Sequence, residues 1–447
     1  MTQNLQGVHQ SKVSTQEFLV SRTDSVASSE KTEGRAHSGI FIYSDILQEE
    51  LKDILIGEAL IKSTAEWYKD LESFGVLIIK IDDCDNPSIQ DKDKSVDTYI
   101  SVAKSISGVR CEGDKLWGQV GDDLFACFFP LAGETALLEN AERLKQDLAG
   151  RCSRTISIGT AAYPTIKYNK DEILGNAKKA VDHAAFFGPD STVSFDSVSL
   201  NISGDKLYQR GDIDEAVTEF ETALFLDSND VNVRNSLGVC YGILGHYNKA
   251  LEQFDEVIRL DPEDIMAIYN KGHVNLLIGD KEKALEIFLS AGNPGEAIYE
   301  LVFELGKIYI EKGMYAEGKE YIEKALELKP DSGPAFRYLG ECFESDGQIR
   351  EAIDVYKKAV KQNPYDAFSL STLGYLFEVS GENVEIATMF CEQSIDISPD
   401  NAVFRHRLGQ LYYKQNMFEE ALTHFKKAEE LGHDSSEFIK KTHEQVE

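Results

Sequence analysis

A 34-residue repeat in the C-terminal half constrains the fold of this 447-residue chain more than any other feature. The clearest copy, residues 231–264, has Gly238 at position eight, Ala250 at position twenty, Phe254 at position twenty-four and Pro262 near its end. Related copies begin near residues 197, 265, 299, 333, 367 and 402, which makes about seven. A period of this length predicts stacked pairs of helices, because one pair cannot bury its own apolar face.

The residue types at fixed positions explain how such a stack would pack. Small residues at positions eight and twenty let helices approach closely, aromatic residues at positions eleven and twenty-four fill the space between neighbouring pairs, and proline stops the second helix. Three departures are local. Gly318 replaces the usual alanine, residues 290–297 ("SAGNPGEA") should shorten the second helix of the third copy, and an extra residue near Val384 should distort a turn.

This pattern resembles the tetratricopeptide repeat. The resemblance implies an all-α solenoid over residues 198–435, and the polar segment 436–447 should add a capping helix. Such solenoids bind protein segments along the surface formed by the first helix of each repeat.

The N-terminal half has a different pattern. Residues 1–38 are rich in Ser, Thr and Gln and predict a disordered arm. Residues 45–74 have helical periodicity, whereas "VLIIKI" (76–81) is an apolar strand and later strands alternate with helices. We therefore expect one α/β sheet domain over residues 39–197, and a multidomain fold of α/β plus all-α class.

A predicted hairpin in this domain has an acidic turn. Its sequence, "GQVGDDLFACFFP", resembles the signature hairpin of the GGDEF family, the diguanylate cyclases. The resemblance implies that Asp82, with Asp83 as a fallback, and Asp123 hold Mg²⁺ or Mn²⁺ against a triphosphate, because hard cations prefer oxygen ligands.

Other positions of the family pattern are altered. Asp122 stands where the second signature glycine belongs, and Leu124 replaces the catalytic glutamate. Further family positions are changed at Lys178, Ala185, Glu112 and Lys115. Because the loss of several catalytic groups normally abolishes activity, we expect a degenerate, inactive domain without catalytic residues.

The resemblance to tetratricopeptide repeats also implies a set of groove residues on the first helices. These are Tyr269, His273, Phe303, Lys307, Arg337, Glu341, Phe368, Tyr375, His406, Gln410 and Tyr413. The lysine and asparagine pattern of the chaperone-type carboxylate clamp is missing from the corresponding positions, which argues against a C-terminal acidic tail as ligand. Residues 201–447 carry 25 basic and 46 acidic residues, which favours a basic or amphipathic protein partner, with homo-oligomerisation as the runner-up.

Charge and composition exclude several functions. The net charge is −31 and the basic residues form no cluster, so nucleic-acid binding is not expected. The sequence contains no apolar run of the roughly 18 residues that a membrane-spanning helix needs. Seven scattered cysteines without a CxxC motif suggest reduced thiols and a cytoplasmic location.

Two functions remain open at this point. The first is a scaffold that binds a protein segment in the repeat groove, uses no cofactor and carries the inactive cyclase-like domain as a docking or regulatory module. The alternative is a metal-dependent nucleotide-binding enzyme or sensor that uses Asp82 and Asp123 with Mg²⁺.

Overall fold

The fold was analysed in a computed structural model, in which residues 41, 43–82, 92–111, 113–165, 167–291 and 298–446 are described. The predicted disordered arm, Asp83 and Glu112 lie outside these residues. The chain divides into two compact units, Met1–Pro262 and Glu263–Glu447.

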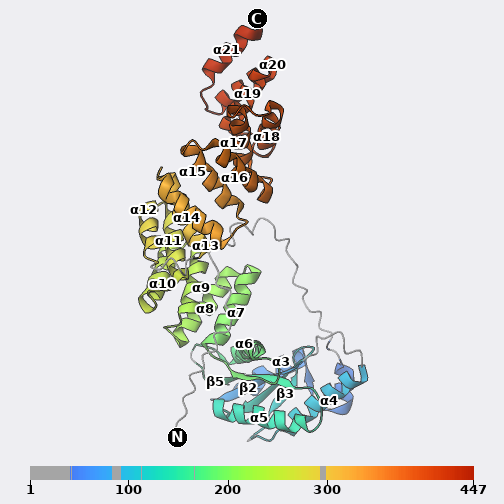
Figure 1. The fold of residues 1–447 in the computed structure, drawn as a ribbon. Helices are drawn as coiled ribbons and strands as arrows, with labels where there is room; N and C mark the ends of the chain where they lie inside the picture. Colours follow the sequence, from blue (N-terminus) through green and yellow to red (C-terminus); the bar gives the residue numbers. More distant parts are fainter. Residues whose placement is uncertain are drawn as a thin grey trace. The chain divides into compact units, whose positions relative to one another are not determined.

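The first unit begins with a mixed sheet and its covering helices (Figure 1). The strands are β1 (Leu55–Ile56), β2 (Phe74–Ile81), β3 (Leu116–Gln119), β4 (Leu124–Pro130), β5 (Ile156–Tyr163) and β6 (Thr192–Ser194). The helices are α2 (Ser44–Glu50), α3 (Glu58–Trp67), α4 (Lys92–Gly108), α5 (Glu134–Ala149) and α6 (Ile173–Ala184), with short 3₁₀ turns η1 (Lys170–Glu172) and η2 (Ala185–Phe187) beside α6.

The sheet has the strand order β1-β3-β4-β2-β5-β6. The central strand β2 pairs antiparallel with both β4 and β5, whereas β1 and β6 pair parallel with their neighbours at the two edges. From β2 to β5 the elements follow the order β-α-β-β-α-β, a recurring arrangement for small sheets covered by helices. The α/β sheet expected from the sequence is therefore present.

Side-chain alternation along β2 builds a core on each face of the sheet. Leu77, Ile79 and Ile81 face α4 and α5, while Val76 and Ile78 face α3 and α6. Figure 1 shows α4 and α5 on one side of the sheet and α6 on the other. This double covering explains why "VLIIKI" is apolar at consecutive positions.

The helical structure expected over residues 45–74 is present only in part, because a short strand interrupts it. The chain forms α2, the short strand β1 and then α3, with Gly57 between β1 and α3 at a φ of 55°. Such a positive φ suits glycine, and β1 hydrogen-bonds alongside β3. Pairing with a distant strand thus overrides the local helical periodicity.

Seven successive helix pairs follow in the described chain. They are α7 (Ser197–Arg210) and α8 (Ile213–Leu226), α9 (Val231–Ile243) and α10 (Tyr247–Leu260), α11 (Ile265–Ile278) and α12 (Lys281–Leu289), α13 (Tyr299–Glu311) and α14 (Tyr315–Leu328), α15 (Gly333–Ser345) and α16 (Ile349–Gln362), α17 (Ala367–Val379) and α18 (Val384–Ile397), and α19 (Ala402–Lys414) and α20 (Phe418–Glu430). The last helix is α21 (Ser436–Val446). As expected from "SAGNPGEA", α12 has 9 residues, compared with 14 in α10.

The glycine at position eight lies directly against the residue at position twenty-four of the same pair. A Cβ atom added to Gly238 would lie 2.6 Å from Cε1 of Phe254, and one added to Gly409 would lie 2.7 Å from Cε1 of Phe425. The Phe254 and Phe425 side chains are fully buried. Position twenty-four therefore packs within its own pair, whereas the sequence suggested that it fills the space between neighbouring pairs.

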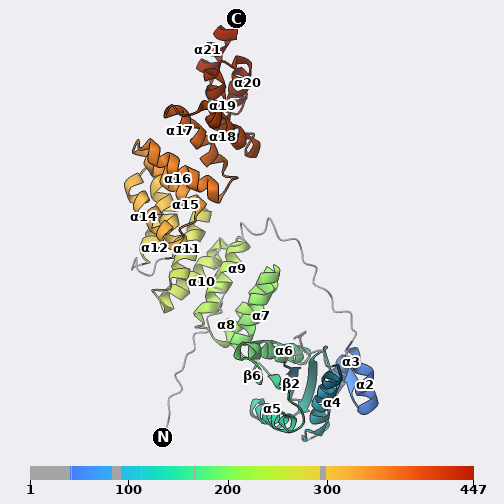
Figure 2. The same ribbon diagram turned by 45° about the vertical axis from the view of Figure 1, so that its right-hand side comes forward.

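The sheet continues into the first helix pair without a long linker. The helix α7 begins three residues after β6 and is capped by Asp196, whose carboxylate accepts a hydrogen bond from Ser199 N at 2.8 Å. Lys179 on α6 forms a half-buried ion pair with Glu219 on α8 at 2.6 Å. Figure 2 shows α7 and α8 beside α6, so the sheet and the first helices form one packed unit.

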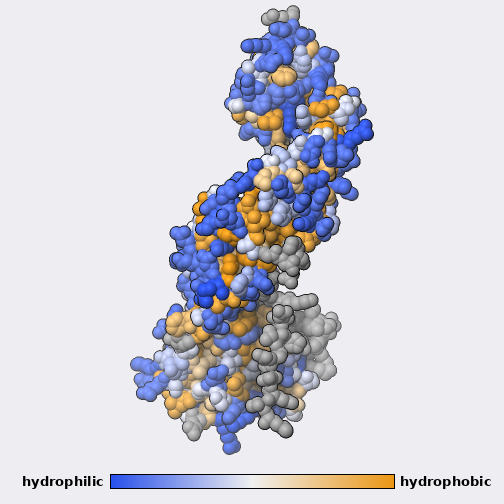
Figure 3. Space-filling view, turned by 60° about the vertical axis from the view of Figure 1, so that its left-hand side comes forward, coloured by the Kyte–Doolittle hydropathy of each residue, from blue (hydrophilic) through white to orange (hydrophobic). Residues whose placement is uncertain are grey.

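Other expectations concern the surface and the thiols. In the described part of the chain, no helix combines the length and apolar character needed to cross a membrane. The face seen in Figure 3 is largely hydrophilic over the C-terminal repeats, with smaller hydrophobic patches. The cysteines that the structure describes are free thiols, and Cys127, Cys240, Cys342 and Cys391 are buried, whereas Cys84 lies outside the described residues.

We predict that Gly238→Ala lowers the free energy of unfolding by about 1–3 kcal/mol, because the new methyl group would overlap Phe254. Gly175→Ala on α6 is the matched control, since its Cβ would meet no atom within 4 Å. It should leave stability unchanged or raise it by about 0.5–1 kcal/mol. Urea unfolding followed by circular dichroism measures both changes, and equal stability of the two variants would contradict this packing.

Candidate functional site

The acidic hairpin has the expected form. The strands β3 and β4 pair antiparallel, and Asp122 and Asp123 lie in the turn between them. The carbonyl oxygen of Asp123 accepts a hydrogen bond from Ile81 N at 3.0 Å, which sets this turn beside the end of β2. Asp82 follows Ile81 directly, so the structure brings the backbone of the two predicted metal ligands close together.

The carboxylate of Asp82 is already occupied by the chain itself. Its Oδ2 accepts hydrogen bonds from Thr155 Oγ1 at 2.7 Å and from Asp190 N at 2.9 Å, and its Oδ1 accepts one from Ser157 Oγ at 2.8 Å. Asp82 is 8% exposed. These contacts join the end of β2 to β5 and to the loop after η2, which is a structural role for a buried carboxylate.

The hairpin carboxylate also has a partner. Asp123 Oδ2 lies 3.7 Å from Nζ of Lys80, which lies on β2 two residues before Asp82. Over the described residues, no three His, Cys, Asp or Glu side chains gather as a metal site would require. Mg²⁺ binding by Asp82 and Asp123 stays a prediction, and the observed contacts favour a structural role for Asp82.

The altered signature positions have structural roles too. Leu124 begins β4 and packs against the core on the α3 and α6 side of the sheet. Lys115 donates hydrogen bonds to the carbonyl oxygens of Ile106 at 2.9 Å and Ser107 at 2.7 Å, at the C-terminus of α4. A cation stabilises this end of a helix, so Lys115 serves the fold.

The predicted groove residues lie on the first helices of the second unit: α11, α13, α15, α17 and α19. We call the surface formed by these helices the inner-helix face. Helices α13 and α15 are in contact, as are α17 and α19. All the predicted residues are partly exposed except Tyr269 and His406, which are 1% and 9% exposed.

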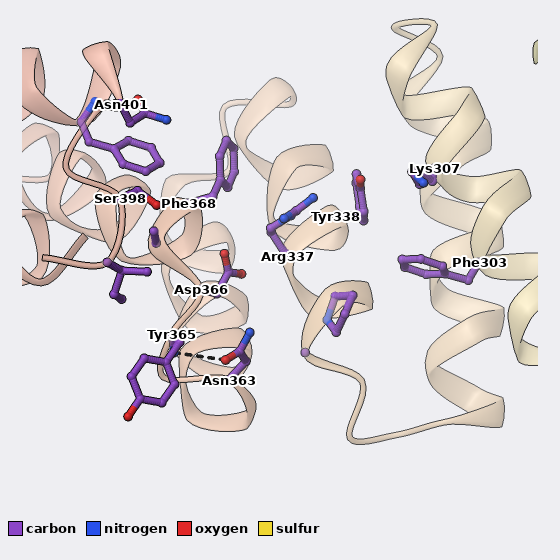
Figure 4. A pocket seen from close by; sticks show the side chains of 15 residues that line it. Phe303, Lys307, Arg337, Tyr338, Asn363, Tyr365, Asp366, Phe368, Ser398 and Asn401 are labelled. Carbon is purple, nitrogen blue, oxygen red and sulfur yellow. Dashed lines mark hydrogen bonds between the residues drawn. The ribbon is translucent and has the colours of Figure 1, made fainter. Parts of the chain in front are cut away.

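Four of the predicted residues line one cavity of about 570 Å³, shown in Figure 4: Phe303 and Lys307 on α13, Arg337 on α15 and Phe368 on α17. In Figure 4 the two side chains of α13 project toward those of α15. The other lining residues are Gly333, Pro334, Tyr338, Asn363, Tyr365, Asp366, Ala367, Ile397, Ser398, Asn401 and Phe404. We call this cavity the inner-face pocket.

Two loops form part of the pocket rim, and the helical pattern of the sequence did not predict them. Asn363, Tyr365 and Asp366 belong to the "NPYD" loop before α17, and Ser398 and Asn401 belong to the "SPDN" loop before α19. Both loops carry a helix-capping residue just before a repeat begins. This signal, an Asp or Asn after a proline turn, could have marked the rim of the pocket.

Charges in the pocket are only partly compensated. Lys307 Nζ lies 3.2 Å from Glu304 Oε2, whereas Arg337 Nε lies 3.7 Å from Glu341 Oε1. Burial raises the pKa of Glu341 to about 7, although the attraction of Arg337 opposes this shift. Near neutral pH, Glu341 therefore carries only part of a negative charge.

Tyr269 is a correction to the predicted groove surface. Its ring is stacked 5.9 Å from that of His273 and 5.9 Å from that of Phe288, at position twenty-four of the same pair. It belongs to the core of the pair. Burial, together with the charge of Lys307, lowers the pKa of His273 to about 4, so this imidazole is neutral at physiological pH.

His406 is a second correction. Its Nδ1 lies 2.8 Å from Ser435 Oγ, its ring lies 4.2 Å from that of His433 and 5.0 Å from that of Phe438 on α21. The capping segment therefore covers His406. Sequence position alone placed it in the groove because it did not show where the last helix docks.

The remaining groove residues lie outside the inner-face pocket. Tyr375 faces the guanidinium of Arg407, with the ring centroid 5.0 Å from Cζ. Tyr413 packs edge-on against Phe418, and Gln410 lies half-exposed on α19. Their roles in binding stay predictions.

We predict that Asp82→Asn lowers the free energy of unfolding of the sheet domain by about 2–3 kcal/mol, because an amide nitrogen would face hydrogen-bond donors. Asp122→Asn, in the exposed turn, should change it by less than about 0.5 kcal/mol. Both tryptophans, Trp67 and Trp117, lie in this domain, so their fluorescence during urea unfolding measures the effect. Equal effects of the two variants would argue against the structural role of Asp82.

Comparison with known families supports the repeat assignment. A family model described as "TPR repeat" matches residues 204–245, and models described as "Tetratricopeptide repeat" match residues 231–264, 303–367 and 402–434. The third copy and most of the sixth fall outside these matches. They are the copies with the shortened helix and the extra residue.

Individual relatives cover only part of the chain. Protein CTR9 homolog of Arabidopsis thaliana is 27% identical over 139 residues, which is 30% of this chain and 13% of that protein. Photosystem I assembly protein Ycf3 of Prochlorococcus marinus (strain NATL2A) is 35% identical over 72 residues, 15% of this chain and 42% of that protein. The chain thus spans less than half of these curated relatives.

Solved structures show the same kind of similarity. The crystal structure of YrrB, described as a TPR protein with an unusual peptide-binding site, is 22% identical with a TM-score of 0.38, and the match covers 42% of this chain and 96% of that one. The repeat assignment rests on the family models and on the observed helix pairs. The C-terminal part of this chain is therefore built from tetratricopeptide repeats.

Proposed function

We propose that this chain is a protein-interaction scaffold, in which the inner-face pocket and the helices around it bind a segment of another protein. A basic or amphipathic segment suits the acidic repeats, whose net charge favours the approach of cationic partners. Homo-oligomerisation is the runner-up, and sedimentation of the purified chain distinguishes it.

The observation that carries this proposal is the convergence of Phe303, Lys307, Arg337 and Phe368 on one cavity of about 570 Å³. These residues come from three successive repeats, far apart in sequence. Aromatic side chains together with a few polar groups are the usual composition of a pocket of roughly 300–1,000 Å³ that binds a ligand. Tyr365, 78% exposed at the rim, adds another aromatic surface that a partner could cover.

We propose that the sheet domain acts as a docking or regulatory module for this scaffold. We interpret it as a GGDEF-like domain without catalytic activity. The β-α-β-β-α-β order and the acidic hairpin support that interpretation, and Leu124 and the occupied carboxylate of Asp82 are poorly suited to phosphoryl chemistry.

We predict that Phe303→Ala and Phe368→Ala each weaken binding of a selected peptide at least about tenfold, because the pocket loses an aromatic wall. Random 12-residue peptides displayed on phage are selected on the full chain, and the affinity of a synthetic winner is measured by fluorescence anisotropy. Tyr315→Ala on α14, 37% exposed and outside the pocket, is the matched control and should bind normally. If all three variants bind alike, the pocket is not the binding site.

A second prediction concerns the sheet domain. Incubation of the purified chain with Mg²⁺ and GTP or ATP should yield no cyclic dinucleotide and should shift Tm by less than about 1 °C, because a ligand stabilises only a protein that it binds. Liquid chromatography with mass spectrometry detects the product, and differential scanning fluorimetry measures Tm. Product formation that is lost in Asp123→Asn would favour the enzyme alternative.

A further inference from the structure

Arg337 occupies an unusual place in the inner-face pocket. Its guanidinium carbon lies 4.7 Å from the ring centroid of Tyr338 and 5.3 Å from that of Phe368. Cation–π contacts with two rings help to fix the position of this charged group in the pocket. Figure 4 shows Arg337 and Tyr338 on the same helix, opposite Phe303 and Lys307.

One nitrogen of the Arg337 side chain lacks a hydrogen bond, although the guanidinium also hydrogen-bonds to the side chain of Tyr338. Its Nε is buried and has no hydrogen-bond partner within the described chain. The closest carboxylate, Glu341, lies 3.7 Å away, which is an ion pair without a good hydrogen bond. Because Nε is buried, an acceptor on a ligand would reach the guanidinium at its terminal nitrogens, and the Arg337 side chain as a whole is 32% exposed.

Two cations, Lys307 and Arg337, line the pocket within repeats that are acidic overall. Burial raises the pKa of Tyr338; the charges of Arg337 and Lys307 oppose that shift, whereas the charge of Glu341 adds to it, so both cations lie near this ring. Asp366 is the acidic residue among those lining the pocket. Its carboxylate already caps α17, with Ser369 Oγ at 2.7 Å from Oδ2.

Two amide side chains at the rim can hold a peptide backbone. Asn363 Oδ1 accepts a hydrogen bond from Tyr365 N at 3.1 Å, and Asn401 Oδ1 accepts from Val403 N at 3.0 Å. Their oxygen atoms thus serve the local turns. The structure describes no acceptor for either Nδ2 atom, so both can donate to carbonyl oxygens of a bound segment.

We propose that Arg337 binds the side-chain carboxylate of an Asp or Glu residue in the partner segment, next to an aromatic or aliphatic residue that packs in the same pocket. This inference rests on the function proposed above. The acidic surface attracts basic residues of the segment over a distance, whereas the pocket selects one acidic residue among them. The expected partner is therefore amphipathic, with cationic flanks and a single carboxylate anchor.

The test compares peptides selected on the full wild-type chain with those selected on Arg337→Gln. Random 12-residue peptides on phage should be enriched on the wild-type chain for Asp or Glu beside an aromatic or aliphatic residue. Arg337→Gln should lose the acidic preference and keep the apolar one, because the rings remain. Circular dichroism and Tm establish that each variant is folded.

A double-mutant cycle then measures the contact directly. Replacing the peptide's Glu by Gln should weaken binding to the wild-type chain about tenfold or more, and less than about twofold in Arg337→Gln. Arg337→Lys keeps the positive charge but loses the planar guanidinium, so it should give an intermediate effect. This variant replaces Arg337→Gln in the cycle if Arg337→Gln fails to fold.

The outcomes separate the two proposals. Peptides that bind in a Phe368-dependent way, but without an acidic preference or any effect of Arg337→Gln, would overturn the carboxylate site and leave the interaction scaffold standing. Peptides with basic residues facing Arg337 would overturn it as well. Failure to enrich any Phe368-dependent peptide would overturn both proposals.

Discussion

The repeat half depends on the contact between a glycine and a large side chain within six of the seven helix pairs that the structure describes; in the α17–α18 pair, Gly374 meets Cys391 instead. At Gly238 and Gly409 the missing Cβ leaves just enough room for the rings of Phe254 and Phe425. This contact holds the two helices of a pair close together. The first helices are then presented at regular intervals, and the inner-face pocket follows from this spacing because Phe303, Arg337 and Phe368 come from consecutive repeats.

Periodicity predicted the repeats well because each signal is local and recurs. The seven helix pairs, the shortened α12 and the acidic hairpin all followed from residue types at fixed offsets. The failures have a common physical origin in long-range contacts. Residues 45–74 have a helical pattern, yet β1 interrupts it and pairs with β3, some 60 residues further along the chain.

The candidate site was predictable only in part for the same reason. Helical spacing placed Phe303, Lys307, Arg337 and Phe368 on one surface, and the structure gathers them in one pocket. Helical spacing could not show that Tyr269 packs into its own helix pair or that α21 covers His406. Nor could it show that the loops at Asn363 and Asn401 complete the rim, since loop positions have no helical period.

A helix that is not part of a repeat packs on the first helix pair and another packs on the last, and this matters for self-association. In the first unit α6 packs on α7 and forms an ion pair with α8 through Lys179 and Glu219, and in the second α21 packs on α20. A stack of like modules grows head to tail when its terminal faces are bare. Here both terminal faces are covered by segments of different sequence, so the surfaces that a further repeat would pack against are already occupied within the described chain.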